Sequence, residues 1–159
     1  MSQPAELPQP PQTPDGPRAQ AIHAVLEAYV DHLIADLATG PEAEAPWHLE
    51  AELPTGQGDL ASWLARTPRC AVIGPPGSGK TAAMARAALL MARQWRAGGG
   101  PLPVLVDLGQ GRAWEGLEEL AIRTLNVPQP AGLRLADIGP CTLFLDNLHR
   151  SADVYLFEG

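Results

Sequence analysis

The sequence of 159 residues is poor in basic side chains and contains a single lysine, Lys80. Its 11 Lys and Arg residues stand against 18 Asp and Glu residues, so the formal net charge is −7. Nucleic acids and anionic membranes are bound through clusters of Lys and Arg, which this composition does not supply. We therefore expect neither a nucleic-acid partner nor a membrane partner.

Cysteine is also scarce, and long apolar runs are missing. Cys70 and Cys141 each begin a short apolar run, so we expect reduced core residues of an intracellular protein; a disulfide is the alternative. No stretch approaches the ~20 consecutive apolar residues of a membrane span, and the N-terminus lacks the pattern of a signal peptide. The four histidines lie in separate segments without the paired spacing of a zinc site. These features predict a cytoplasmic protein without structural zinc.

The 45% of hydrophobic residues is enough for the core of one domain. Residues 1–18, rich in Pro and Gln, are predicted to form a disordered tail. From 19 to 37 apolar residues recur at steps of three and four, which predicts a helix that ends before Gly40 and Pro41. We favour packing of this helix on its own domain. The alternative is that its face from Ile22 to Leu37 binds a partner protein or a second copy of the chain.

Residues 39–58 show no clear period and are predicted to be a linker in which Trp47 and Leu49 contact an apolar surface. The predicted helix and this linker together make up residues 19–58. Asp59 is predicted to cap a short helix that extends to Ala65 and buries Leu60, Trp63 and Leu64. A nucleotide-binding domain is predicted for residues 59–159.

Strands and helices alternate in this second part. Apolar runs bounded by turn signals predict buried strands, and the spacing of apolar residues predicts helices. The strands are predicted at 70–73, 103–108 and 141–145, and the helices at 81–97 and 115–125. This order predicts an α/β fold with a parallel sheet, in which ligands bind beyond the carboxyl ends of the strands. The loop after Ile73 and the residue Asp146 both belong to that edge.

The loop between the first strand and the long helix fits the phosphate-binding pattern G-x-x-x-x-G-K-[ST]. Glycines let the backbone fold tightly and point successive N–H groups at phosphate oxygens. The lysine supplies a positive charge for the β- and γ-phosphates, and the threonine hydroxyl suits Mg²⁺, which prefers hard oxygen ligands. We predict phosphate binding by Gly74, Gly77, Ser78, Gly79, Lys80 and Thr81. The alternative is a glycine-rich turn that binds nothing.

Asp146 directly follows the apolar run C-T-L-F-L. A carboxylate at the end of a buried strand carries a desolvation cost unless a cation compensates it. Magnesium bound to a nucleotide is such a cation, and phosphate-loop enzymes hold it with an aspartate of this kind. We therefore predict Thr81 and Asp146 as the two protein ligands of Mg²⁺.

Four segments resemble the NACHT group of signal-transduction NTPases, a branch of the P-loop ATPases. They are D-L-A-S-W-L (59–64), V-I-G-P-P-G-S-G-K-T (72–81), L-P-V-L-V-D-L (102–108) and I-G-P-C-T-L-F-L-D-N-L-H-R (138–150). The resemblance implies a three-layer P-loop NTPase fold and an ATP-binding switch, in which ATP and Mg²⁺ favour an open, assembling state. It also implies an N-terminal fragment with an incomplete sheet, because the family places a further strand between the phosphate-loop strand and the aspartate strand.

The residues after Asp146 depart from the family pattern. The family usually has a small residue, an apolar residue and then one or two acids, whereas this chain has Asn147, Leu148, His149 and Arg150. Without that carboxylate the obvious group for activating water is missing, so we expect binding with slow or absent hydrolysis. His149 is a weaker candidate for the role, and the sequence identifies no catalytic residue.

Two other functions remain open from the sequence. One is a small P-loop kinase or hydrolase whose catalytic base is not recognisable; a kinase-like fold would set the two motif strands side by side in a shorter chain. The other is an interaction fragment that binds no nucleotide, in which the helix from Ile22 to Leu37 is the functional element.

Overall fold

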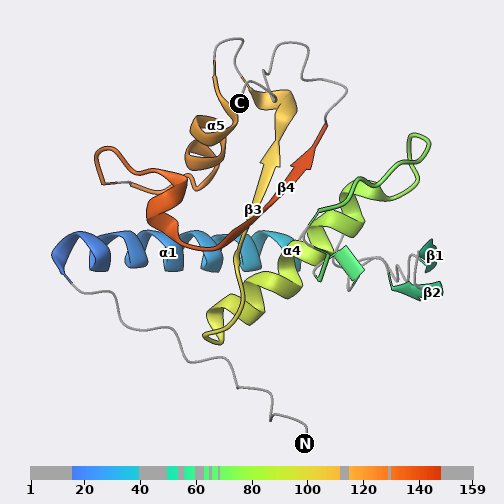
Figure 1. Cartoon of the computed structure of the whole chain (residues 1–159), viewed down its shortest axis with the longest axis horizontal. Coiled ribbons are helices and arrows are strands. Elements are labelled where there is room, and N and C mark those ends of the chain that lie inside the picture. The colour runs from blue at the N-terminus through green and yellow to red at the C-terminus, as the bar shows by residue number, and fades with distance from the viewer. Residues whose placement is uncertain are drawn as a thin grey trace, which may run out of the picture.

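The computed structural model has a mixed α/β fold (Figure 1). It describes residues 16–39, 50–53, 56–59, 63–64, 66–67, 69–111, 115–128 and 130–147. The helices are α1 (Pro17–Thr39), α4 (Lys80–Arg96) and α5 (Leu117–Thr124), with short 3₁₀ turns η1 (Leu108–Gln110) and η2 (Leu135–Ile138). The strands are β1 (Glu50–Leu53), β2 (Gly56–Asp59), β3 (Leu102–Asp107) and β4 (Cys141–Asp146).

β3 and β4 form a parallel pair, in which Leu102 lies opposite Cys141 and Asp107 opposite Asp146. Two of the three predicted strands and their parallel pairing are therefore confirmed, with bounds shifted by about one residue. β3 is mostly buried, whereas β4 has one buried side chain, that of Phe144. Phe144 packs with the alanines of α4, which places that helix against the strand pair.

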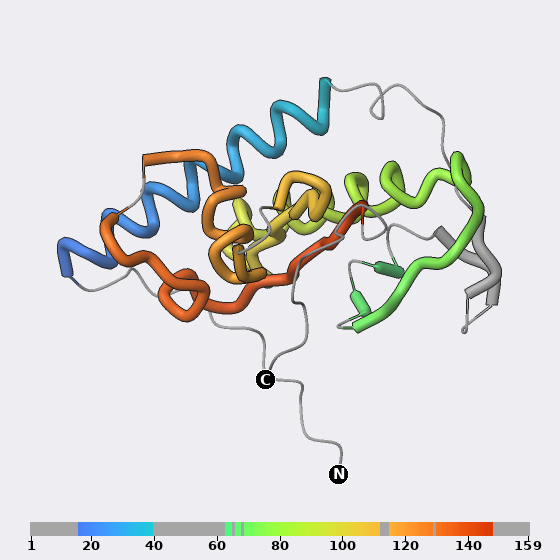
Figure 2. The backbone as a smooth tube through the Cα atoms, turned by 90° about the horizontal axis from the view of Figure 1, so that it is seen from above, coloured from blue at the N-terminus to red at the C-terminus, as the bar shows by residue number. Residues whose placement is uncertain are grey.

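The long helix α1 packs against its own domain, as we favoured from the sequence. Its buried side contributes to one core with β3 and α5; these α1 residues are Ile22, Leu26, Tyr29, Val30 and Leu33. The Leu105 N–H of β3 donates a hydrogen bond to the Tyr29 hydroxyl at 3.3 Å. In Figure 2, β3 lies between β4 and α1. The apolar face that could have bound a partner is thus covered by the chain itself.

The start of α1 corrects the boundary predicted for the N-terminal tail. Pro17 is the first residue of the helix and Arg18 the second, so the last two residues assigned to the tail are helical. Proline suits this position because its fixed φ is helical and its missing N–H would have no partner in the first turn. Residues 1–15 lie outside the described residues. Among the helices that the structure describes, none has the length and apolar character needed to span a bilayer.

The predicted linker contains a hairpin, which the sequence analysis missed. β1 and β2 pair antiparallel, with Glu50 opposite Asp59. Asp59 therefore ends a strand. Trp63 and Leu64 are helical, as predicted, and Thr67 Oγ1 donates to Trp63 O at 2.8 Å. β2 reads G-Q-G-D, and glycine and aspartate are depleted in strands, so composition gave no strand signal. Trp47, Leu49, Leu60 and Ala65 lie outside the described residues.

The strand predicted at 70–73 is wrong. This segment has no strand conformation, and Ile73 is 94% exposed. An apolar run becomes a buried strand only when neighbouring strands pair with it. In the described part of the chain the parallel sheet consists of β3 and β4, and neither pairs with 70–73. Cys70 is consequently exposed and Cys141 half-buried; both are free thiols, but Cys70 is not a core residue.

Candidate functional site

The helix α4 positions the predicted phosphate loop. Its bounds, Lys80–Arg96, confirm the helix predicted at 81–97. The buried side of α4 is lined by small residues, Ala83, Ala87, Ala88 and Ala92, which allow the helix to approach the strands closely. α4 runs back alongside β3, so its first turn lies toward the carboxyl ends of the strands (Figure 1). Helix N-termini attract anions through their unpaired N–H groups and the helix dipole.

The loop before α4 favours glycine at two of the predicted positions because of its backbone conformation, and leaves little space for a side chain at a third. Gly77 and Gly79 have φ angles of 77° and 80°, a left-handed conformation that L side chains adopt at a cost. A Cβ atom on Gly74 would lie 2.9 Å from Ser78 Oγ. The Ser78 N–H donates to Pro75 O at 3.2 Å and closes the turn. These contacts explain the glycine spacing by backbone geometry.

The side chain of Lys80 folds back over this loop. Its ammonium donates hydrogen bonds to the carbonyl oxygens of Gly74 and Pro75, both at 2.8 Å, and lies 3.4 Å from Ser78 Oγ. The only lysine in the chain is therefore held at the loop by neutral acceptors. Thr81, the next residue, is exposed.

Two carboxylates lie side by side where β3 and β4 end. Asp107 and Asp146 are register partners at the carboxyl ends of these strands. Asp146 is half-buried, and its Oδ1 accepts a hydrogen bond from the Asn147 N–H at 2.8 Å. The Asn147 side chain reaches the other strand, because Nδ2 donates to Asp107 Oδ1 at 2.7 Å.

Asp107 is a residue of this edge that the sequence analysis missed. Its carboxylate also accepts hydrogen bonds from the Gly109 N–H at 2.9 Å and from Gln110 Nε2 at 3.1 Å. A signal was present, because P-V-L-V-D repeats the pattern of an apolar run that ends on aspartate. The strand end is therefore built from two carboxylates with different hydrogen-bond partners.

Oxygen donors of the kind that Mg²⁺ prefers lie at the start of α4 and at the ends of β3 and β4. Mg²⁺ usually keeps several waters and takes one or two protein carboxylates together with substrate phosphates. Within the described residues no group of three or more His, Cys, Asp and Glu side chains could hold a metal by itself. Thr81 at the start of α4 and Asp146 at the end of β4 are the residues that could contribute ligands. The contact of Phe144 with Ala83 and Ala87 joins the two elements that carry them.

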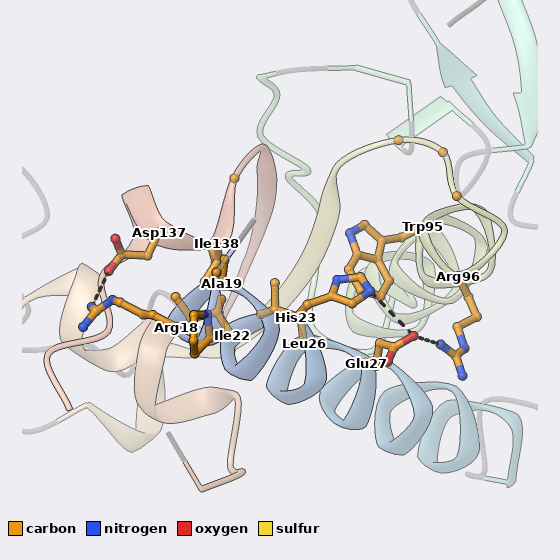
Figure 3. Close-up of a pocket in the computed structure, with 16 residues that line it drawn as sticks. Arg18, Ala19, Ile22, His23, Leu26, Glu27, Trp95, Arg96, Asp137 and Ile138 are labelled. Atoms are coloured by element: carbon orange, nitrogen blue, oxygen red, sulfur yellow. Dashed lines mark hydrogen bonds and ion pairs between the residues drawn. The ribbon is translucent and has the colours of Figure 1, made fainter. Parts of the chain in front are cut away.

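The opposite end of the strand pair carries a groove of about 860 Å³ that the sequence did not suggest (Figure 3). It lies between the first turns of α1, the end of α4 and the turn η2, and Trp95 forms part of its wall. Arg18 pairs with Asp137 at 3.5 Å on one side, and Arg96 pairs with Glu27 on the other. The charges along the groove are thus balanced and favour no class of ligand.

Comparison of the chain with protein-family models gives no match, and comparisons with the curated proteins and with the solved structures give none either. The structure therefore defines only the fold class, which is α/β. Its features are a parallel strand pair, a loop before α4 and two carboxylates at the ends of the strands.

Proposed function

We propose that this chain is a nucleotide-binding switch module of a NACHT-like P-loop NTPase, with ATP and Mg²⁺ as its ligands. The observation that carries the proposal is the loop before α4. Its three glycines allow a tight turn, and the ammonium of Lys80 lies over that turn. The order loop, α4, β3, α5 and β4 supports the P-loop fold that the proposal includes.

The contacts of Lys80 suggest how phosphate would bind. In the free loop its ammonium donates to the neutral carbonyls of Gly74 and Pro75. An ammonium binds an anionic phosphate oxygen more strongly than a neutral carbonyl oxygen, because Coulomb attraction between the opposite charges adds to the hydrogen bond. A β- or γ-phosphate would therefore draw the ammonium away from the carbonyls. The N–H groups of the loop and of the first turn of α4 would hold the remaining phosphate oxygens.

Magnesium is the second ligand in the proposal. Thr81 and Asp146 would hold it, and the ion would neutralise part of the phosphate charge. Asp146 accepts a hydrogen bond from Asn147, which leaves carboxylate lone pairs for a cation and its waters. In this scheme the two residues act through binding and orientation.

We propose binding without efficient turnover. Asn147 follows Asp146 and carries an amide, which cannot act as a general base at neutral pH. Its Nδ2 also donates to Asp107, so the amide is engaged at the strand ends. A switch of this kind would change its conformation with the bound nucleotide, triphosphate or diphosphate. A partner protein would have to bind to a surface other than the buried face of α1.

Thermal unfolding with ATP, GTP and the diphosphates, with and without Mg²⁺, tests the proposal. A ligand at 100 times its Kd adds about 2.7 kcal/mol to the free energy of unfolding. For a chain of this size that raises the Tm by roughly 5–10 °C. We expect such a rise with ATP and Mg²⁺; an unchanged Tm with every nucleotide would refute the proposal. Phosphate release from ATP that disappears in Asp146→Asn would instead support the kinase or hydrolase alternative.

A further inference from the structure

Asn147 adopts a backbone conformation that few residues tolerate. Its φ angle is 59°, and asparagine is one of the few non-glycine residues that enter this left-handed region readily. In this conformation the Asn147 N–H donates to the carboxylate of the preceding residue, Asp146, at 2.8 Å.

The side chain of Asn147 adds a second link, across the strand pair. Nδ2 donates to Asp107 Oδ1 at 2.7 Å. A single residue therefore binds both carboxylates, through its backbone to one and through its amide to the other. Adjacent strands lie about 4.8 Å apart, so two carboxylates in register repel each other unless donors are placed between them.

The two carboxylates differ in how fully they are engaged. Asp107 accepts hydrogen bonds from Gly109 and Gln110 in its own turn and from Asn147, the residue after β4. Within the described residues, Asp146 accepts one hydrogen bond, from the Asn147 N–H. The arrangement leaves Asp146 as the carboxylate available to a cation.

We propose that Asn147 is a positioning residue that fixes Asp146 for Mg²⁺ and holds Asp107 out of the metal site as a structural anchor. This inference rests on the proposed function, since it concerns how the same site holds Mg²⁺. Removal of the amide would take one hydrogen bond from Asp107, break the link between the strand ends and leave the Asp146 carboxylate poorly oriented. Binding of Mg²⁺ would become weaker, whereas binding of the phosphates by the loop would not change.

The test is the magnesium enhancement, defined as the Kd for ATP without Mg²⁺ divided by the Kd with Mg²⁺, measured by titration calorimetry. Asn147→Gly keeps the left-handed backbone and removes only the amide. We expect the enhancement to fall about tenfold, the loss of one charge-assisted hydrogen bond, while the Kd without Mg²⁺ stays unchanged. Asn126→Gly is the matched control, because Asn126 has a φ of 46° at the end of α5 and lies outside the site.

The outcomes separate this inference from the proposed function. If the wild-type chain binds ATP with magnesium enhancement and Asn147→Gly lowers the Tm but keeps the enhancement, the residue is only structural and the inference is wrong. If the wild-type chain binds no nucleotide, both proposals fail. Should circular dichroism show that Asn147→Gly is unfolded, Asn147→Ser decides by the same ratio, because its hydroxyl is too short to reach Asp107.

Discussion

The packing of α1 against β3 can be tested through the titration of Tyr29, whose hydroxyl lies at this contact. This side chain is only 5% exposed, and its hydroxyl accepts a hydrogen bond from the Leu105 N–H. Burial raises the pKa of Tyr29 to about 12, and the Leu105 hydrogen bond opposes this rise. An unfolded tyrosine titrates near 10, so the folded state retains the proton more strongly than the unfolded state.

The sign and size of the effect follow from this difference. A pKa that is higher in the folded state contributes stability that is fully present below pH ~10 and is lost as the pH rises through about 12. Two pH units at ~1.4 kcal/mol each give about 3 kcal/mol. We expect the free energy of unfolding, measured by urea denaturation, to fall by about 2 of these 3 kcal/mol between pH 10 and pH 12, because the loss begins below pH 10 and ends above pH 12, in addition to the background from other groups.

The variant Tyr29→Phe supplies that background. It removes the titrating group, and it also deprives the Leu105 N–H of the hydroxyl, which costs about 1–3 kcal/mol at pH 9. We therefore expect a less stable variant whose stability falls less steeply above pH 10. Parallel curves for the wild-type chain and Tyr29→Phe between pH 10 and pH 12 would refute the reasoning.

Two further predictions concern the loop and the segment before it. Gly77→Ala forces a side chain into a left-handed φ of 77° and should lower the free energy of unfolding by about 1–2 kcal/mol. The control is Gly99→Ala, where a Cβ would lie 3.8 Å from Gln94 O, and it should leave urea denaturation nearly unchanged. Equal effects of the two substitutions would contradict this account of the loop. Because Cys70 is exposed and Cys141 half-buried, a thiol reagent should label Cys70 first in the native chain, and protection of Cys70 would mean that 70–73 is a buried strand after all.

The elements that the sequence predicted well carry their signal locally. β3 and β4 are short apolar runs between turn residues, and α4 consists of strong helix formers between two glycine-rich turns. The pairing of β3 with β4 follows from their alternation with helices. The tight turn before α4 was predictable for the same reason, since Gly77 and Gly79, which adopt positive φ angles, lie directly before the helix; phosphate binding by this loop stays a prediction.

The elements that were missed depend on distant or weak signals. The segment 70–73 has the composition of a strand, but a strand needs partners, and the described residues supply none beside it. The β1–β2 hairpin has the opposite character, because its sequence is polar and rich in glycine although its two halves pair. Asp107 had a local signal that was overlooked, but its link to Asn147 could not be predicted from spacing, since it depends on the register of β3 and β4 and joins residues 40 positions apart.

The binding of ATP with Mg²⁺ by the wild-type chain and by Lys80→Ala, measured by titration calorimetry, tests the central claim most directly. Arg93→Ala is the control, because it removes one positive charge from the far end of the same helix. We predict binding by the wild-type chain and the control, and an affinity roughly 10- to 150-fold lower in Lys80→Ala, which loses a charge-assisted contact of about 1.5–3 kcal/mol. The same affinity in Lys80→Ala and the wild-type chain, or no binding by either, would contradict the account.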